Sequence, residues 1–331
     1  MKLAVVGVTG LVGRKMIEIL EKKDIKIEAL FPVASEKSTG KRILFKNKEY
    51  RVMRIHQLID KKPEIALFSA GSQVSKDWAP QLAEIGCRVI DNSSYWRMSH
   101  NHKLIVPEIN FNDLNLSSNK VFSSDMIIAN PNCSTIQLVI AISEIHKKFK
   151  IKRMIISTYQ AVSGSGKKAI DQLRNESKSI SEKKVYERQI FNNIIPQCDV
   201  FDEDLYTKEE HKIINETNKI LNSKIRITAT AVRVPIENSH SESVNIELVN
   251  NTTNEELIEV LKQTNGVQYV DSVNKHYLTP QEATGSDLVY VGRVRQDFSK
   301  NNCFNLWVVS DNLRKGAATN AIQILEKIIN K

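Results

Sequence analysis

The sequence has few of the features that mark several large protein classes. Its four cysteines, Cys87, Cys133, Cys198 and Cys303, lie far apart and follow no disulfide or metal-binding spacing. Glycine and proline number only 12 and 8 in 331 residues, which excludes a collagen-like chain. The longest apolar stretches, such as residues 138–142, are far shorter than the roughly 20 residues of a membrane-spanning helix. We therefore expect reduced thiols, a cytoplasmic location, no metal site and no membrane partner.

The composition is that of a folded protein with a basic excess. Hydrophobic residues make up 41% and charged residues 26%, which excludes intrinsic disorder. Lys and Arg outnumber Asp and Glu by 47 to 38, giving a formal charge of +9. Such a balance is compatible with nucleic acid, an anionic membrane, small anions or a lysine-rich surface. Because no basic run is interleaved with aromatic residues, the sequence predicts no nucleic-acid partner.

Two styles of secondary structure follow one another along the chain. The first part alternates short apolar strands (3–8, 25–33, 64–70 and 87–91) with amphipathic helices (14–22 and 78–85), which is typical of a doubly wound parallel sheet. The second part contains longer alternating strands at 151–162, 225–234, 244–249, 289–295 and 304–310, as in a largely antiparallel sheet. The sequence therefore predicts an α/β protein. Its Rossmann-like domain spans residues 1–130 and is completed by a C-terminal helix at 313–331, and its α+β domain spans 131–312.

A glycine-rich turn connects the first strand to the first helix. Gly7, Gly10 and Gly13 would permit a tight turn and let backbone N–H groups approach a pyrophosphate at the helix N-terminus. The spacing differs from the usual G-x-G-x-x-G, so a purely structural turn is the alternative. After the second strand, Ser35-Glu36-Lys37-Ser38 has more hydroxyls and lysines than acids. This composition favours the 2′-phosphate of NADP over the free ribose of NAD, although Glu36 would suit NAD.

Cys133 differs from the other cysteines in its local sequence, NPNCST at residues 130–135. Pro131 ends the incoming segment, and Asn132 or Ser134 can cap a helix that starts here. In the first turn, unpaired N–H groups and the helix dipole favour a thiolate, which is the nucleophilic form of cysteine. The alternative is a small buried hydrophobic residue, and this is our interpretation of the other three cysteines.

The motifs together resemble aspartate-semialdehyde dehydrogenase over essentially the whole chain. They are GVTGLVG (7–13), NPNCST (130–135), TYQAVSGSG (158–166), EEHK (209–212), RVPIENSHS (233–241) and DNLRKGAATNA (311–321). The resemblance implies an oxidoreductase of the pathway to lysine/diaminopimelate, threonine, methionine and isoleucine. It would interconvert L-aspartate 4-semialdehyde and L-aspartyl 4-phosphate with NADP and phosphate, through a cysteine thioester. It also implies a homodimer built through the second, catalytic domain.

The resemblance assigns roles to individual residues. Cys133 is similar to the nucleophile, Gln160 to the residue that orients the acyl group, and His240 to the acid/base catalyst. Substrate binding is implied for Arg233 (α-carboxylate), Glu209 (amino group) and, around the phosphate, Arg97, Asn132 and Lys212. Cofactor binding is implied for Gly7, Thr9, Gly10, Leu11, Val12, Gly13, Ser35, Ser38, Ser163, Gly164 and Asn312. Many bacterial members have arginine where this chain has Lys37, which would meet a phosphate without arginine's planar fork.

Other interpretations of these residues stay open at the level of sequence. Without the resemblance, Glu209 and Lys212 are an ordinary surface ion pair at helical spacing, and His240 is a structural histidine near a strand end. A reductase of similar build could act on N-acetylglutamyl phosphate or a CoA thioester. A catalytically silent relative acting as an interaction protein is the alternative from another class. The set Cys133, Gln160, Arg233 and His240 argues against the silent relative.

Overall fold

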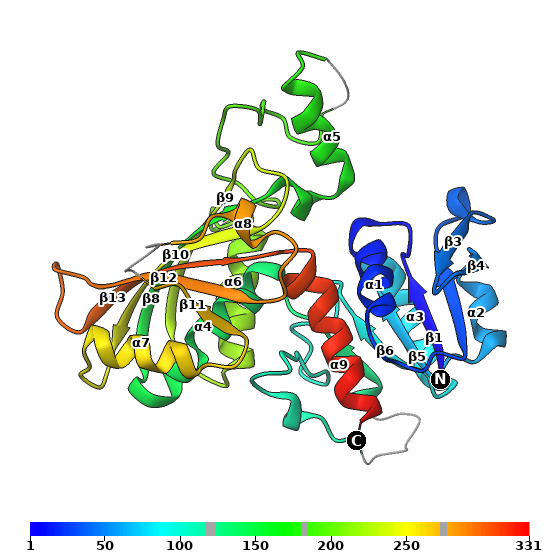
Figure 1. Cartoon of the computed structure of the whole chain (residues 1–331), viewed down its shortest axis with the longest axis horizontal. Helices are drawn as coiled ribbons and strands as arrows, with labels where there is room; N and C mark the ends of the chain where they lie inside the picture. The colour runs from blue at the N-terminus through cyan, green and yellow to red at the C-terminus, as the bar shows by residue number, and fades with distance from the viewer. Residues whose placement is uncertain (117–123, 181–183, 272–276, 331) are drawn as a thin grey trace. The chain divides into compact units, whose positions relative to one another are not determined.

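The computed structural model describes residues 1–116, 124–180, 184–271 and 277–330 of the chain (Figure 1). It consists of two compact units. The first contains Met1–Pro131 together with Ala317–Lys331, and the second contains Asn132–Gly316. Within the described ranges, no helix combines the length and the apolar character needed to cross a membrane.

The first unit is built on a five-stranded sheet in the order β2-β1-β5-β6-β7, in which all neighbouring strands are parallel. These strands are β1 (Lys2–Val6), β2 (Ala29–Val33), β5 (Ile65–Phe68), β6 (Arg88–Asp91) and β7 (Ile127–Ala129). The helices are α1 (Leu11–Glu21), α2 (His56–Lys61), α3 (Ser72–Glu84) and α9 (Thr319–Ile329). A separate hairpin pairs β3 (Arg42–Phe45) with β4 (Lys48–Arg51).

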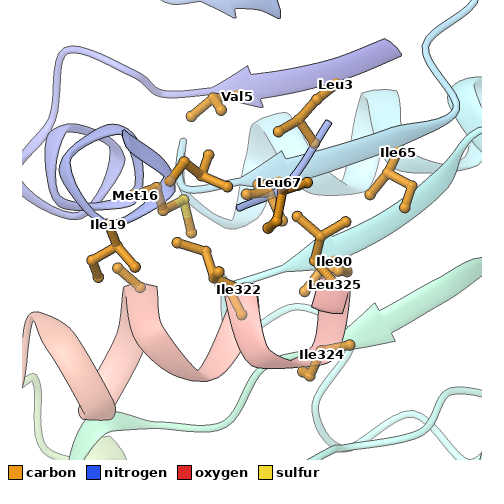
Figure 2. Packing of buried hydrophobic residues seen from close by; sticks show 14 of the residues in the cluster. Leu3, Val5, Met16, Ile19, Ile65, Leu67, Ile90, Ile322, Ile324 and Leu325 are labelled. Carbon is orange, nitrogen blue, oxygen red and sulfur yellow. The ribbon is translucent and has the colours of Figure 1, made fainter. Parts of the chain in front are cut away.

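Alternation along β1 places apolar side chains on both faces of this sheet. Leu3 packs in one buried cluster with Met16 of α1 and Ile322 of α9 (Figure 2). Its neighbour Ala4 belongs to a second cluster, which contains Leu82 of α3. Helices therefore cover both faces, and the predicted doubly wound parallel sheet is confirmed.

The turn after β1 requires glycine. Gly7 has φ +87°, and a Cβ built on it would lie 2.1 Å from the carbonyl oxygen of Ser69. A Cβ on Gly13 would lie 2.3 Å from the carbonyl oxygen of Gly7, so α1 packs directly on the turn. The strand expected at 3–8 consequently ends at Val6. The strand expected at 25–33 is also shorter, because β2 pairs with β1 only from Ala29 onward.

The second unit is built on a mixed six-stranded sheet in the order β11-β12-β13-β10-β8-β9. The strands are β8 (Ile151–Gln160), β9 (Arg226–Arg233), β10 (His240–Leu248), β11 (Val267–Tyr269), β12 (Val289–Gln296) and β13 (Cys303–Ser310). The two outer pairs are parallel and the three inner pairs antiparallel, which confirms a largely antiparallel sheet. The helices are α4 (Cys133–Phe149), α5 (Lys167–Glu176), α6 (Lys208–Ile220), α7 (Asn254–Gln263) and α8 (Pro280–Ala283). A π-helical turn, Arg314–Ala318, precedes α9.

Candidate active site

Cys133 is the first residue of α4, and its helix start is held by the residue before it. The Asn132 side-chain oxygen accepts hydrogen bonds from the backbone N–H groups of Ser134 (2.9 Å) and Thr135 (3.2 Å). Asn132, one of the two caps that the sequence allowed, is therefore the N-cap. Cys133 is partly exposed, whereas Cys87, Cys198 and Cys303 are buried. The helix start thus presents one accessible thiol where the dipole favours a thiolate.

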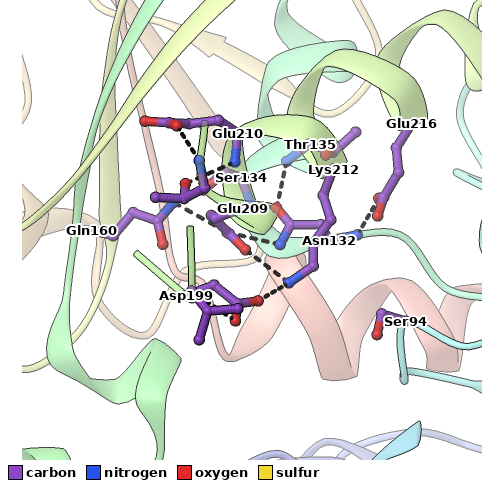
Figure 3. A network of polar contacts seen from close by, with 12 residues as sticks. Ser94, Asn132, Ser134, Thr135, Gln160, Asp199, Glu209, Glu210, Lys212 and Glu216 are labelled. Atoms are coloured by element: carbon purple, nitrogen blue, oxygen red, sulfur yellow. Dashed lines mark hydrogen bonds and ion pairs between the residues drawn. The ribbon is translucent and has the colours of Figure 1, made fainter. Parts of the chain in front are cut away.

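Glu209 of α6 joins several of the predicted residues in one network (Figure 3). Its Oε1 accepts hydrogen bonds from Asn132 Nδ2 at 2.8 Å and from Gln160 Nε2 at 3.1 Å. Its Oε2 lies 3.2 Å from Lys212 Nζ, which also contacts Asp199 at 2.7 Å. Glu209 as a whole is only 6% exposed, so these donors stabilise its charge in a buried position. A substrate ammonium would find a fixed, buried carboxylate here.

Three further residues lie at the ends of neighbouring strands. Gln160 ends β8 and Arg233 ends β9, and the parallel register pairs them directly. His240 begins β10. The backbone of Ala161, the residue after Gln160, holds both other residues: Arg233 Nη1 donates to the Ala161 carbonyl at 2.7 Å, and the Ala161 N–H donates to His240 Nδ1 at 3.0 Å. The sheet thus brings together a guanidinium and an imidazole that are separate in the sequence.

His240 is neutral in this environment. It is fully buried, and burial, followed by the nearby Arg233 charge, lowers the pKa of His240 from 6.5 to about 3. Because Nδ1 accepts the Ala161 N–H, the imidazole proton lies on Nε2. This Nε2 has no hydrogen-bond partner within the described part of the chain. The geometry therefore presents an unengaged N–H donor.

Glycines permit close approach at two points of the site. A Cβ on Gly164 would lie 3.0 Å from Arg233 Nη1 and 3.4 Å from His240 Nε2. A Cβ on Gly316 would lie 3.0 Å from the Cβ of Cys133. Ser163, beside Gly164, is hydrogen-bonded to the Asn312 side chain at 3.0 Å, and Asn312 in turn accepts the Ser239 N–H at 2.8 Å. The predicted residues Ser163, Gly164 and Asn312 therefore lie around His240.

The other predicted residues belong to the first unit. The turn that carries Gly7, Thr9 and Gly10 leads into α1, which begins with no side-chain cap and no acid in its first turn. This helix start, which contains Leu11, Val12 and Gly13, suits the negative charge of a pyrophosphate. A short 3-10 turn, Glu36–Ser38, follows β2. Ser35 immediately precedes this turn and Ser38 is its last residue. Arg97 is buried and donates to the Asn92 carbonyl at 2.9 Å.

Sequence reasoning missed two residues, Glu216 and Arg54. Glu216 accepts the backbone N–H of Asn132 at 2.7 Å. It lies seven residues after Glu209 on the same helix, and this spacing could have indicated it. Arg54 forms an ion pair with Glu36 at 2.6 Å, a contact that no local pattern shows. Among the described residues, no cluster of three or more His, Cys, Asp or Glu side chains could hold a metal ion.

The chain is similar to known proteins over its whole length. Residues 2–117 match the family model "Semialdehyde dehydrogenase, NAD binding domain", and residues 142–315 match "Semialdehyde dehydrogenase, dimerisation domain". The chain is 46% identical to the aspartate-semialdehyde dehydrogenase of Aquifex aeolicus (strain VF5), over 100% of this chain and 98% of the relative. The crystal structure of aspartate semialdehyde dehydrogenase II from Vibrio cholerae is similar with a TM-score of 0.94 and 41% identity, covering 100% and 98% of the two chains. A structure of that enzyme complexed with ASA gives a TM-score of 0.94 at 40% identity, covering 99% and 98%.

Proposed function

The chain belongs to the aspartate-semialdehyde dehydrogenase family, and from this premise we propose that it works through a thioester on Cys133 with NADP as cofactor. It is an oxidoreductase of amino-acid biosynthesis that uses a nicotinamide cofactor to interconvert L-aspartate 4-semialdehyde and L-aspartyl 4-phosphate. The observation that carries the mechanism is the placement of the accessible Cys133 thiol at the capped start of α4.

Cys133 begins the reaction in the biosynthetic direction. Its thiolate attacks the acyl carbon of L-aspartyl 4-phosphate, the carbon–oxygen bond to phosphate breaks, and phosphate leaves with the bonding electrons. The product is a thioester on Cys133. Gln160, held by Glu209 at 3.1 Å, orients this acyl group. In the opposite direction phosphate is the nucleophile that releases the thioester, so activity depends on phosphate.

The bound nicotinamide supplies the hydride that brings the acyl carbon to the aldehyde oxidation level. His240 acts on the oxygen of the same carbon. Because its proton lies on Nε2, the neutral imidazole donates a hydrogen bond to the oxyanion as negative charge develops there. The oxyanion then re-forms the carbonyl as the carbon–sulfur bond breaks, so Cys133 leaves as a thiolate and L-aspartate 4-semialdehyde is released. Arg233 and His240 are both hydrogen-bonded to the Ala161 backbone, so the group proposed to bind substrate and the group that donates this hydrogen bond are held together.

Substrate recognition follows from the charges of the site. Arg233 binds the α-carboxylate through its planar guanidinium, and Glu209 receives the amino group. A free amino group on the substrate distinguishes aspartate semialdehyde from an N-acetylated analogue, and the buried Glu209 carboxylate favours the free amine. Asn132 and Lys212, both hydrogen-bonded to Glu209, are proposed for the phosphate side. The assignment of Arg97 to phosphate rests on the family resemblance.

NADP rather than NAD is proposed from the loop after β2. Ser35, Lys37 and Ser38 offer two hydroxyls and a cation for a 2′-phosphate, and the neighbouring acid Glu36 forms an ion pair with Arg54. The rest of the proposed cofactor site is Gly7, Thr9, Gly10, Leu11, Val12, Gly13, Ser163, Gly164 and Asn312. Comparing kcat/KM for NADP and NAD tests this choice. A higher value with NAD would contradict it.

The assembly and location are also part of the proposal. The match of residues 142–315 to a dimerisation domain supports a homodimer formed through the second unit. The buried, reduced cysteines support a cytoplasmic protein. We propose that residues 1–130 with the helix at 313–331 bind the dinucleotide, and that residues 131–312 carry catalysis and dimerisation.

The test is a spectrophotometric assay of NADP reduction with two substrates in parallel. We expect turnover of L-aspartate 4-semialdehyde that depends on added phosphate, and little turnover of N-acetylglutamate semialdehyde. Preference for the acetylated substrate would favour the alternative reductase. Turnover that needs CoA in place of phosphate would favour an acyl-CoA reductase. No turnover of any of these would favour a silent relative.

A further inference from the structure

Glu216 is a buried carboxylate that contacts the segment leading into Cys133. It lies on α6 and is only 1% exposed. Its Oε2 accepts the backbone N–H of Asn132 at 2.7 Å (Figure 3). The same helix supplies Glu209, whose Oε1 accepts the side-chain amide of Asn132 at 2.8 Å. Two carboxylates from α6 therefore hold a single residue, one through its side chain and the other through its backbone.

Asn132 is fixed at three points by these contacts. Its backbone N–H is bonded to Glu216, its Nδ2 to Glu209, and its Oδ1 to the first N–H groups of α4. An N-cap residue must keep an extended backbone while its side chain turns back onto the helix, and Asn132 has φ −61° and ψ 146°. Because Cys133 is the next residue, any rotation of the Asn132 backbone moves the base of the thiol side chain.

We propose that Glu216 is a positioning residue for the nucleophile, acting through the Asn132 backbone. The proposal rests on the proposed function, in which Cys133 attacks the acyl carbon. Glu209 is the acid proposed for the substrate ammonium, whereas Glu216 accepts the backbone N–H group at the helix entry. In this proposal Glu209 binds the substrate and Glu216 positions the Cys133 thiol.

The hydrogen bond between Glu216 and the Asn132 N–H determines which substitutions of Glu216 should affect the enzyme. The Asn132 N–H needs an oxygen acceptor at this distance, and both a carboxylate and an amide side chain offer one. Glu216→Gln keeps an acceptor of the same length, whereas Glu216→Ala leaves a buried N–H group without its partner. A buried donor without a partner is costly, and the chain would rotate to relieve it. Displacing a reacting group by about 1 Å can lower a rate by roughly 100-fold.

The experiment measures kcat, both KM values and the rate of Cys133 alkylation by iodoacetamide in the full-length enzyme. In Glu216→Ala we expect kcat and the alkylation rate to fall roughly 10- to 100-fold, while KM for semialdehyde and for NADP stays within about threefold. Glu216→Gln should restore both rates to within about threefold of the wild type. A merely structural acid would alter the melting temperature without this selective change in thiol reactivity.

Glu176 provides a matched control. Its Oε2 accepts the backbone N–H groups of Ile190 and Phe191, both at 2.8 Å, so Glu176→Ala removes a carboxylate that also holds backbone. We expect this variant to keep the alkylation rate of Cys133. If Glu216→Ala does not fold, Glu216→Asp, which is shorter by one methylene, should show the same selective fall.

Two results would overturn the proposal. One is a folded Glu216→Ala or Glu216→Asp enzyme with wild-type kcat and alkylation rate. The other is an equal fall of both rates in Glu176→Ala. Cys133→Ala, assayed in parallel, separates this outcome from failure of the proposed function. An inactive Cys133→Ala with an unaffected Glu216→Ala refutes only the role of Glu216, whereas an active Cys133→Ala refutes the nucleophile itself.

Discussion

Acidification is expected to destabilise this protein, and His240 accounts for a defined part of the effect. Its pKa is lowered from 6.5 to about 3 in the folded state, first by burial and then by the charge of Arg233. In the unfolded chain the same imidazole takes up a proton at its ordinary pKa. The unfolded state therefore binds more protons below pH 6.5, and stability is lost as the pH falls from about 6.5 towards 3.

The size of the effect follows from the shift. Each pKa unit corresponds to about 1.4 kcal/mol, so the full penalty for His240 is roughly 5 kcal/mol. At about pH 5 only part of this penalty applies, namely about 2 kcal/mol. His240→Asn is the variant that isolates it, because the asparagine Oδ1 can take the place of Nδ1 and accept the Ala161 N–H without titrating.

The assay is urea unfolding, followed by far-UV circular dichroism at about pH 7.5 and about pH 5. Between the two conditions, the wild type should lose about 2 kcal/mol more than His240→Asn, since all other titrating groups are shared. At the same time His240→Asn should lower kcat roughly 100- to 10,000-fold, because it lacks the donor at Nε2. Equal pH-dependent losses in the two proteins would refute the argument that His240 is buried and neutral.

Three other predictions concern binding, stability and thiol chemistry. Arg233→Leu should raise KM for semialdehyde roughly 10- to 100-fold and leave KM for NADP almost unchanged, as steady-state kinetics can measure. An equal rise in both KM values would contradict the role of Arg233 in substrate binding. Burial raises the pKa of Glu242 well above its usual range, so the folded state keeps its proton and loses stability as the pH rises above 4.5. Glu242→Gln should therefore be more stable than the wild type in urea at about pH 8, with the difference vanishing near pH 4, and a less stable variant at pH 8 would contradict this. Burial also raises the pKa of Cys87 and Cys198 to about 12, so iodoacetamide should modify Cys133 first, as peptide mapping can check, and earlier labelling of either buried cysteine would contradict it.

Local sequence signals were sufficient to predict the start of α4. Pro131 and Asn132 mark the end of the preceding segment and the start of a helix at Cys133. Asn132 is the N-cap in the structure. The fold class was equally accessible, because short apolar strands and amphipathic helices alternate in the first unit. The glycine turn was also visible, and the structure adds that Gly7 and Gly13 are required by backbone contacts whether or not a ligand binds.

Other features depend on contacts that local patterns do not show. The strand β10 was expected from residue 244, but it begins at His240. The polar residues Ser241 and Glu242 are paired between β8 and β13, and His240 is paired with Ser310 of β13. The hairpin β3–β4 was missed because its turn, Lys46-Asn47, adopts positive φ without a glycine. Glu216 acts on a residue 84 positions earlier in the chain, a relation that only the packing of α6 on α4 creates.

The thioester on Cys133 is tested most directly by trapping it. The enzyme is mixed with L-aspartate 4-semialdehyde and NADP in the absence of phosphate, quenched in acid and analysed by peptide mass spectrometry. The account predicts an aspartyl group on the peptide that contains Cys133, which added phosphate removes before the quench. An unmodified Cys133 peptide in an enzyme that turns over, or an acyl group on another residue, would contradict it.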